Sequence, residues 1–129
     1  MSQLYWHTGL WDVSDQWHDA AEAAFKNLTE QRVILVTTAY VLLECGNAAA
    51  RRPYRGEVNT LRESLEQRNE VLVPTPEEWE LAWQSYHRGD AASAGIVDQL
   101  SFAVMRRGNI QAAFTNDHHF AAAGFTTLF

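Results

Sequence analysis

The stretch Arg32–Cys45 reads RVILVTTAYVLLEC, in which one apolar run passes into a second through two threonines. Its first part, Arg32–Val36, has the length and the branched side chains of a buried β-strand. Thr37 or Thr38 then serves as the N-cap of a helix that we expect to continue to Ala50. A strand that leads directly into a helix is the unit from which α/β folds are built.

The same alternation of strand and helix extends along the rest of the chain. Further short strands are expected at Leu4–Trp6, Val71–Val73, Gln111–Thr115 and Phe125–Leu128. Further helices are expected from Ser14 or Asp15 to Asn27, from Pro53 to Gln67, from a Thr75 cap to His87, from a Ser93 cap to Met105, and at His118–Ala123, with a loop at Arg88–Ala92. We therefore predict a single α/β domain over residues 1–129, a three-layer α/β/α sandwich around a mostly parallel sheet.

The composition places the chain among packed globular proteins. It has 129 residues, a hydrophobic fraction of 47% and five tryptophans, enough for a sizeable core. Its one cysteine, Cys45, excludes an internal disulfide. No apolar stretch approaches the roughly 18 residues of a membrane helix, and no secretory signal is visible. We expect a cytoplasmic protein without a membrane-spanning segment.

The charge of the chain is acidic, but its arginines are grouped. The net charge of −6 argues against a general nucleic-acid coat, which needs clustered basic residues. Arg51, Arg52 and Arg55 form one local group and are the candidate RNA contacts. The alternative is that such groups are solvated helix ends.

Three acidic residues, Glu44, Asp98 and Asp117, lie where the surrounding sequence predicts a core. Glu44 and Asp98 interrupt apolar helical runs, and Asp117 follows an expected strand. A carboxylate among apolar neighbours is costly unless a positive charge meets it. The same runs hold no lysine or arginine, so a shared cation is the simplest partner.

Each of these acids also has a structural interpretation, which stays open at this point. Asp117 or its neighbour Asn116 is a good N-cap for the short helix that follows. Glu44 would face water if its helix were rotated, and Asp98 would be satisfied by a hydroxyl such as that of Ser101.

Together, the three acids suggest a catalytic metal site. In a parallel sheet, sites form beyond the carboxyl ends of the strands, where two acids on separate helices and one at a strand end would converge. All-oxygen ligands suit Mg²⁺ or Mn²⁺. Such an ion polarises a phosphoryl oxygen and generates hydroxide, so the expected reaction is phosphodiester hydrolysis.

Four segments in order resemble the PIN-domain family, in particular the VapC-like ribonuclease toxins of bacterial toxin–antitoxin pairs. They are Asp15–Ala21, Thr37–Glu44, Val97–Met105 and Phe114–Phe120. The resemblance covers nearly the whole chain. It implies a sandwich of helices around a parallel sheet, cleavage of single-stranded RNA, an antitoxin protein as partner, and a homodimer.

The resemblance also implies roles for individual residues. It assigns Glu44, Asp98 and Asp117 to catalysis and to Mg²⁺ or Mn²⁺ binding. The residues expected to line the site are Thr8, Thr115 and Asn116.

One position departs from the family pattern, because His7 stands where the first metal-binding Asp belongs. Three explanations compete. The site has lost at least part of its activity; or Asp12 supplies the missing carboxylate; or His7 itself binds metal through a nitrogen that favours Mn²⁺. Alternative functions are a non-catalytic PIN domain that acts by binding RNA or a partner, and a purely structural role for the acids.

Overall fold

The computed structural model describes residues 3–6, 26, 30–31, 33–53, 55–115 and 117–128. Its strands are β1 (Gln3–Trp6), β2 (Ile34–Thr38), β3 (Val71–Leu72), β4 (Ala112–Phe114) and β5 (Thr126–Thr127). They form one sheet in the order β3-β2-β1-β4-β5, and all four pairings are parallel. The predicted parallel sheet is confirmed.

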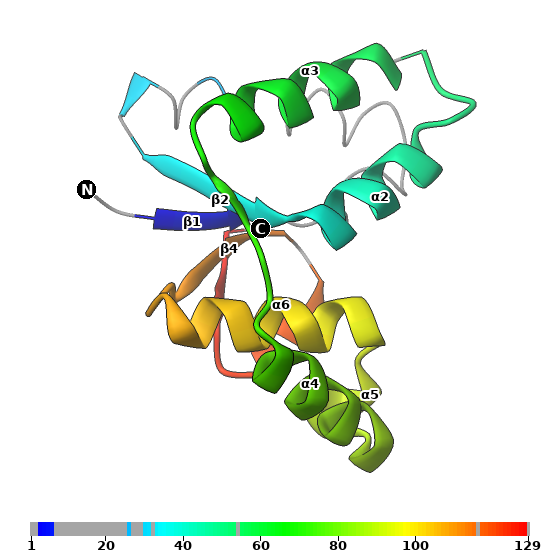
Figure 1. Ribbon diagram of the computed structural model, residues 1–129, viewed down its shortest axis with the longest axis vertical. Helices are drawn as coiled ribbons and strands as arrows, with labels where there is room; N and C mark the ends of the chain where they lie inside the picture. Colours follow the sequence, from blue (N-terminus) through cyan, green and yellow to red (C-terminus); the bar gives the residue numbers. More distant parts are fainter. Residues whose placement is uncertain are drawn as a thin grey trace.

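Helices cover both faces of this sheet. Those described are α2 (Ala39–Ala48), α3 (Arg55–Gln67), α4 (Pro76–Arg88), α5 (Asp90–Ser93), α6 (Ile96–Arg107) and α7 (His118–Ala122). Figure 1 shows α2 and α3 on one side of the sheet and α4, α5 and α6 on the other. The predicted α/β/α sandwich is therefore correct. No helix in the described ranges is long and apolar enough to cross a membrane.

The strand order changes direction at β1. The chain steps from β1 to β2 to β3 towards one edge, and it then returns to add β4 and β5 on the other side. Ligands of open α/β sheets bind where the order reverses, beyond the carboxyl ends of the strands. Here that point lies between the ends of β1 and β4, to the right of the sheet in Figure 1.

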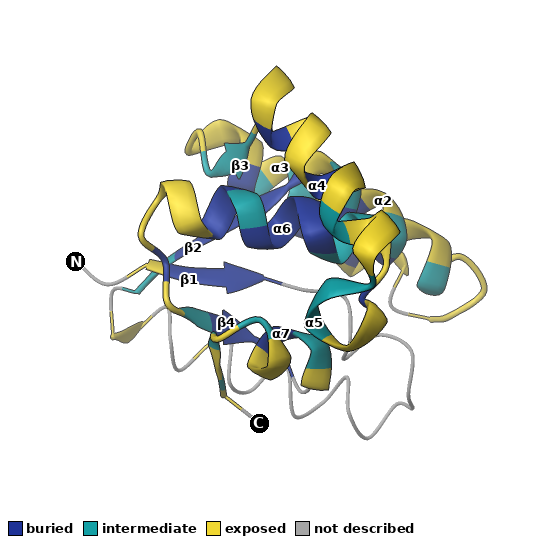
Figure 2. Ribbon diagram, turned by 90° about the horizontal axis from the view of Figure 1, so that it is seen from below, coloured by how far each residue is buried: buried dark blue, intermediate teal, exposed yellow. Residues whose placement is uncertain are grey.

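The core is built around the central strand. Leu4, Tyr5 and Trp6 of β1 are each at most 3% exposed, and Figure 2 shows β1 and β2 as buried. The ring of Trp6 stacks on that of Phe114 in β4, with centroids 5.2 Å apart. Fully burying side chains of this size stabilises the fold by about 1.5–3 kcal/mol each.

Two predicted helix starts are confirmed in detail. Thr38 Oγ1 accepts the backbone N–H of Val41 at 3.3 Å and caps α2. Thr75 and Glu78 form a capping box at the start of α4, with bonds of 2.8 and 3.1 Å. Arg107 at the end of α6 reaches Glu78 at 3.4 Å, so this start is also tied to the neighbouring helix.

The predicted start of α6 at Ser93 is wrong. The helix begins at Ile96 with Gly95 as its N-cap. Ala91, Ala92 and Ser93 instead have φ values of 55°, 57° and 61°, the left-handed conformation, whereas an N-cap residue is extended. The expected loop at residues 88–92 is therefore a left-handed turn, α5, held by a 2.9 Å bond from Gln99 Nε2 to the Asp90 carbonyl.

Other boundaries differ by small amounts. Helix α3 begins at Arg55, two residues after Pro53, because the Arg55 N–H first closes a turn onto the Arg52 carbonyl. The described strands are shorter than expected except for β1 and β2, which each contain one or two residues beyond the predicted limits. The helix predicted from Ser14 or Asp15 to Asn27 lies outside the described residues, apart from Lys26.

The capping box makes a testable contribution to stability. We expect Thr75→Ala to lower the free energy of unfolding by about 1 kcal/mol, because the Glu78 N–H loses its acceptor. Thr60→Ala is the matched control: Thr60 is exposed inside α3 and bonds only back to the Gly56 carbonyl at 3.1 Å. Urea titration of both variants measures the difference, and equal losses would contradict the role of the cap.

Candidate metal centre

Asp117 stands at the point where β4 has ended and α7 begins. Its Oδ1 accepts the backbone N–H of His119 at 2.9 Å, which makes Asp117 the N-cap of α7. The backbone N–H of Asp117 donates to Oγ1 of the fully buried Thr115 at 3.1 Å. The capping role expected for Asp117 is confirmed. It does not exclude metal binding, since a carboxylate offers about four acceptor positions.

Buried hydroxyl groups lie beneath the carboxyl edge of the sheet. Five such residues have 0% exposure and are called here the buried hydroxyl layer: Tyr5, Thr37, Thr38, Ser101 and Thr115. The Tyr5 hydroxyl donates to Ser101 Oγ at 2.6 Å, and Thr37 Oγ1 donates to the Trp6 carbonyl at 2.9 Å. The layer therefore joins the ends of β1 and β2 to α6.

The charge state of Tyr5 is fixed by this environment. The pKa of Tyr5 is raised to about 12, chiefly by burial; the negative charge of Asp98 is a smaller cause in the same direction, and hydrogen bonds to Ser101 and the two threonines oppose the shift. Tyr5 is consequently a neutral hydrogen-bond donor at physiological pH. The interaction also places the Asp98 carboxylate within electrostatic reach of the Tyr5 hydroxyl.

Glu44 and Asp98 lie on helices that begin at this same edge. Asp98 is in the first turn of α6, where an acid is favoured by the helix dipole. Glu44 is in the second turn of α2, directly beyond β2, and α2 contacts α6. Both acids are half-buried, so Glu44 is not turned out into solvent as its alternative interpretation required.

The tightest group of possible ligands is not the predicted trio. Within the described part of the chain, the potential ligand atoms of Asp117, His118 and His119 all lie within 4.8 Å of one another, and Glu44, Asp98 and Asp117 form no such group. An ion bound by all three acids would have to draw them closer. Their assignment to one site therefore stays a prediction.

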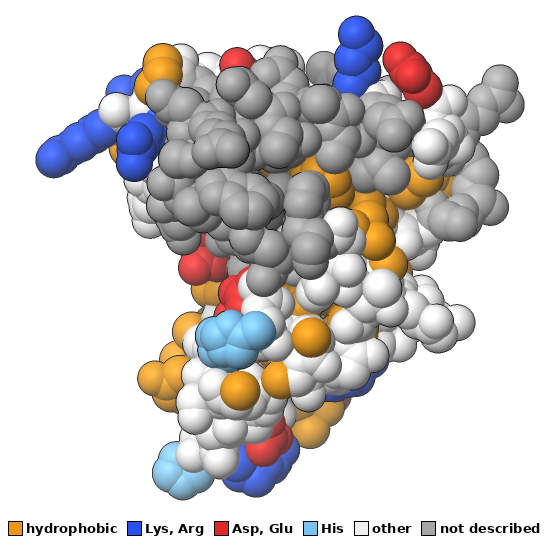
Figure 3. All heavy atoms as spheres, turned by 180° about the vertical axis from the view of Figure 1, so that it is seen from behind, with side chains coloured by type: hydrophobic (Ala, Val, Ile, Leu, Met, Phe, Trp, Pro, Cys, Tyr) orange, Lys and Arg blue, Asp and Glu red, His pale blue; other side chains and the backbone are white. Residues whose placement is uncertain are grey.

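His118 and His119 are neighbours at the start of α7, and their side chains lie close together. Their rings are 4.1 Å apart at 33°, and His119 Nδ1 is 2.6 Å from Asp117 Oδ1. Figure 3 shows histidine side chains next to acidic ones on this face. This group was missed at the sequence level because side-chain directions at a helix start depend on the cap, not on the helical repeat.

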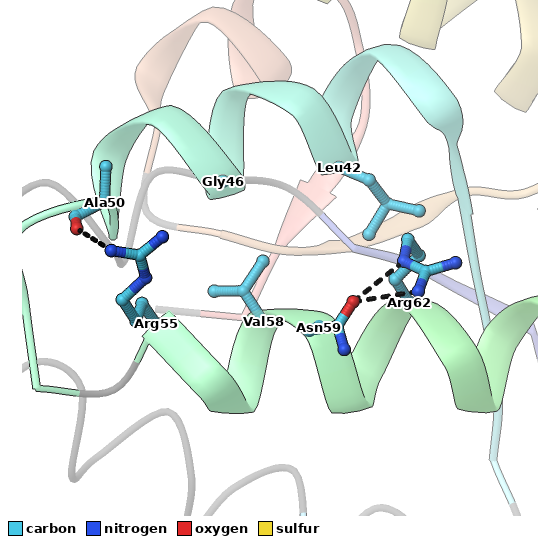
Figure 4. Close-up of a pocket in the computed structure, with 7 residues that line it drawn as sticks. All are labelled: Leu42, Gly46, Ala50, Arg55, Val58, Asn59 and Arg62. Carbon is cyan, nitrogen blue, oxygen red and sulfur yellow. Dashed lines mark hydrogen bonds between the residues drawn. The ribbon is translucent and has the colours of Figure 1, made fainter.

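The arginine group lies elsewhere on the molecule. Arg51, Arg52 and Arg55 are exposed at and after the turn between α2 and α3. Arg55 Nη1 donates to the Ala50 carbonyl at 3.1 Å and borders a shallow hollow of about 210 Å³ between these helices, seen in Figure 4. A role in RNA binding stays a prediction.

Four predicted site positions cannot be placed. His7, Thr8, Asp12 and Asn116 lie outside the described residues. The competing explanations for His7 therefore stay as they were drawn from the sequence.

Comparison with known proteins decides the family. The profile of the PIN domain matches residues 10–126. The chain belongs to the PIN-domain family. The sequence-based assignment is thus confirmed, and with it the ribonuclease class to which these proteins belong.

This PIN domain is similar to one toxin both in sequence and in structure. It is 32% identical, over 97% of each chain, to the 23S rRNA-specific endonuclease VapC20 of Mycobacterium tuberculosis strains CDC 1551 and H37Rv. The crystal structure of Mycobacterium tuberculosis VapC20, described as a Sarcin-Ricin loop cleaving toxin, superposes with a TM-score of 0.72 at 29% identity. It covers 95% of this chain and 96% of that one.

Sequence reasoning assigned Tyr5 of this PIN domain no role, and it considered Thr37 only as a helix cap and Ser101 only as a partner of Asp98, whereas they bond to the Trp6 carbonyl and to Tyr5. Tyr5 reads as an ordinary core residue of a short strand. The sequence did hold a partial signal. Hydroxyl side chains within apolar runs need hydrogen-bond partners when they are buried, and four residues are of this kind: Thr37, Thr38, Ser101 and Thr115.

The buried Tyr5 predicts a specific alkaline instability. The pKa of Tyr5 is raised above its unfolded value of 10, so the folded state holds the phenolic proton more tightly than the unfolded state does. The resulting contribution of Tyr5 to the free energy of unfolding is full below pH 10 and is lost as the pH rises towards 12. It amounts to about 3 kcal/mol.

We therefore expect the free energy of unfolding of Tyr5→Phe to fall less steeply between pH 10 and 12 than that of the wild type. Tyr86→Phe, at a residue 48% exposed, is the control and should keep the wild-type slope. Identical slopes for Tyr5→Phe and the wild type would show that Tyr5 is not held in its neutral form.

Proposed function

We propose that this protein is a metal-dependent endoribonuclease of the VapC toxin type, with its catalytic centre at the carboxyl edge of the sheet. The observation that carries the proposal is the position of Asp117, which caps α7 immediately beyond β4 at the point where the strand order reverses. Asp98 and Glu44 lie on helices that start at this edge. Membership of the PIN family supports the same reaction.

The donors in the proposed centre fit the implied ion. Glu44, Asp98 and Asp117 offer carboxylate oxygens, which suit Mg²⁺ or Mn²⁺. When bound, such an ion supplies a polarised phosphoryl oxygen and a water of lowered pKa. The carboxylates would hold it, and Thr115 and its neighbour Asn116 would line the site.

The residues around these acids keep them in place. Thr115 fixes the backbone of Asp117, and the Tyr5–Ser101 bond fixes the first turns of α6, on which Asp98 sits. Because the Tyr5 hydroxyl stays protonated, it donates a hydrogen bond and adds no negative charge beside Asp98. This support helps the charged side chains to remain half-buried.

The proposed substrate is a structured loop of ribosomal RNA. The similar toxin is described as specific for 23S rRNA and as cleaving the Sarcin-Ricin loop. We infer a related target here, in the cytoplasm. A hairpin with the Sarcin-Ricin sequence should be cut at one position, while a hairpin of the same composition and scrambled loop should remain intact.

The catalytic assignment is tested by single isosteric changes. We expect Asp98→Asn to lower the cleavage rate with Mn²⁺ by at least about 100-fold, because it removes a ligand charge. Glu63→Gln is the matched control, since Glu63 is an exposed acid on α3. Equal rates for wild type and Asp98→Asn would leave only the non-catalytic alternative, in which the fold binds RNA or a partner.

A second copy of the chain and an antitoxin are the proposed protein partners. The surface proposed for self-association is the aromatic stripe on α4, formed by Trp79, Trp83 and Tyr86, which are 39%, 41% and 48% exposed. Neighbouring rings of the stripe are 6.0 and 5.5 Å apart. Contiguous exposed aromatics of this kind mark interaction sites.

The charges beside the stripe favour a second copy over RNA. Glu80 and His87 lie along the same outer flank by helical spacing. In an antiparallel pair of α4 helices, Glu80 of one copy would face His87 of the other, and Trp79 would face Tyr86. Such a patch is self-complementary, as a two-fold interface requires, whereas Glu80 would repel phosphate.

Self-association is tested by placing a charge in the stripe. We expect Trp83→Asp to convert a dimer into a monomer in sedimentation velocity, because it buries a carboxylate between apolar rings. Leu43→Asp is the control, at another exposed apolar residue, 66% exposed on α2. A monomeric wild type, or a Trp83→Asp variant that stays dimeric, would contradict the proposed interface.

A further inference from the structure

The group formed by Asp117, His118 and His119 has a composition that the PIN-type site described above does not require. One carboxylate and two imidazoles bring their ligand atoms within 4.8 Å of one another. His119 Nδ1 lies 2.6 Å from Asp117 Oδ1. At 2.6 Å the two atoms are hydrogen-bonded to each other. Neighbouring ligands at right angles on an ion with bonds of about 2.1 Å are about 3 Å apart, so a small opening of this pair would admit one ion to both atoms.

The group is held on a rigid part of the structure. Helix α7 is anchored by Phe120, which is fully buried and packs edge-on against Phe102 at 4.9 Å. The preceding residue, Asp117, is fixed through Thr115 as described above. The side chains of Asp117 and His119 are 21% and 25% exposed. They are thus partly shielded yet open to an ion from solvent.

The donor atoms of this group favour a different class of ion than the donor atoms of an all-carboxylate site do. Imidazole nitrogen suits first-row transition ions, while Mg²⁺ prefers oxygen ligands and keeps much of its water. Two neutral imidazoles and one carboxylate also carry a charge of −1, compared with −3 for three carboxylates. Mg²⁺, a hard ion, is therefore stabilised less by this group than a first-row transition ion is.

We propose that Asp117, His118 and His119 form a nitrogen-containing site for a divalent first-row transition ion, which makes the catalytic edge of this protein selective for such ions over Mg²⁺. The inference rests on the proposed function, because it shares Asp117 with that centre. In the bound state the neutral His119 imidazole would carry its hydrogen on Nε2, so that Nδ1 and Asp117 Oδ1 are both available to the ion.

The test measures Mn²⁺ binding to the full chain without relying on activity. Electron paramagnetic resonance follows the loss of the free Mn²⁺ signal, and electron spin echo modulation detects a coupled ¹⁴N nucleus. We expect Mn²⁺ to bind about 10-fold or more tightly than Mg²⁺ in competition, with a ¹⁴N coupling from imidazole.

Histidine variants assign the nitrogen. We expect His119→Asn to remove the ¹⁴N coupling or reduce it, and His118→Asn and His119→Asn each to weaken Mn²⁺ binding by about 10-fold or more. Glu63→Gln is the control, because Glu63 is an exposed potential ligand on α3 outside this group, and it should leave Mn²⁺ binding unchanged. The proposal is overturned if no ¹⁴N coupling is seen, or if the three variants bind Mn²⁺ equally well.

The result is separable from that for the proposed function. If RNA is cleaved and Asp98→Asn abolishes cleavage while Mn²⁺ shows no ¹⁴N coupling, the nuclease assignment stands and the nitrogen site is wrong. If the ¹⁴N coupling is present but RNA cleavage is the same for wild type and Asp98→Asn, the nitrogen site stands and the nuclease assignment fails.

Discussion

The parallel pairing of β1 with a strand on each side is the constraint on which the rest of the structure depends. Because β2 and β4 both run parallel to β1, three strand ends meet at one edge of the sheet. The ends of β2 and β4 are followed by helix caps, at Thr38 and Asp117, and the returning helix α6 begins at the same edge. Polar and acidic residues are thus gathered at one place by topology alone.

The buried hydroxyl layer lowers the free-energy cost of placing several acids at one edge of the sheet. An apolar core directly beneath several acids would offer no partners, and each half-buried charge would be costly. Tyr5 and Ser101 instead form a short neutral hydrogen bond below Asp98, and Thr115 satisfies the backbone at Asp117. The layer links strands and helices across the sheet, so stability and the geometry of the site depend on the same contacts.

The sequence predicted the architecture well, for physical reasons visible in particular residues. Branched apolar runs such as Ile34–Val36 and strong caps such as Thr75 specify local structure without help from distant contacts. Ser93 misled because the left-handed backbone of Ala91 and Ala92 is set by tertiary packing and by the Gln99 bond to Asp90. At the site, the three acids were recognisable as misplaced charges, but the pairing of His119 with Asp117 depends on one side-chain orientation at a helix cap.

The position of the metal is the central claim, and anomalous X-ray diffraction from crystals soaked in Mn²⁺ tests it most directly. The predicted result is a peak at the manganese edge beyond the carboxyl ends of β1 and β4, within bonding distance of Asp117 and next to the first turn of α6 that carries Asp98. A peak at another surface of the molecule, or no peak at Mn²⁺ concentrations that support RNA cleavage, would contradict it.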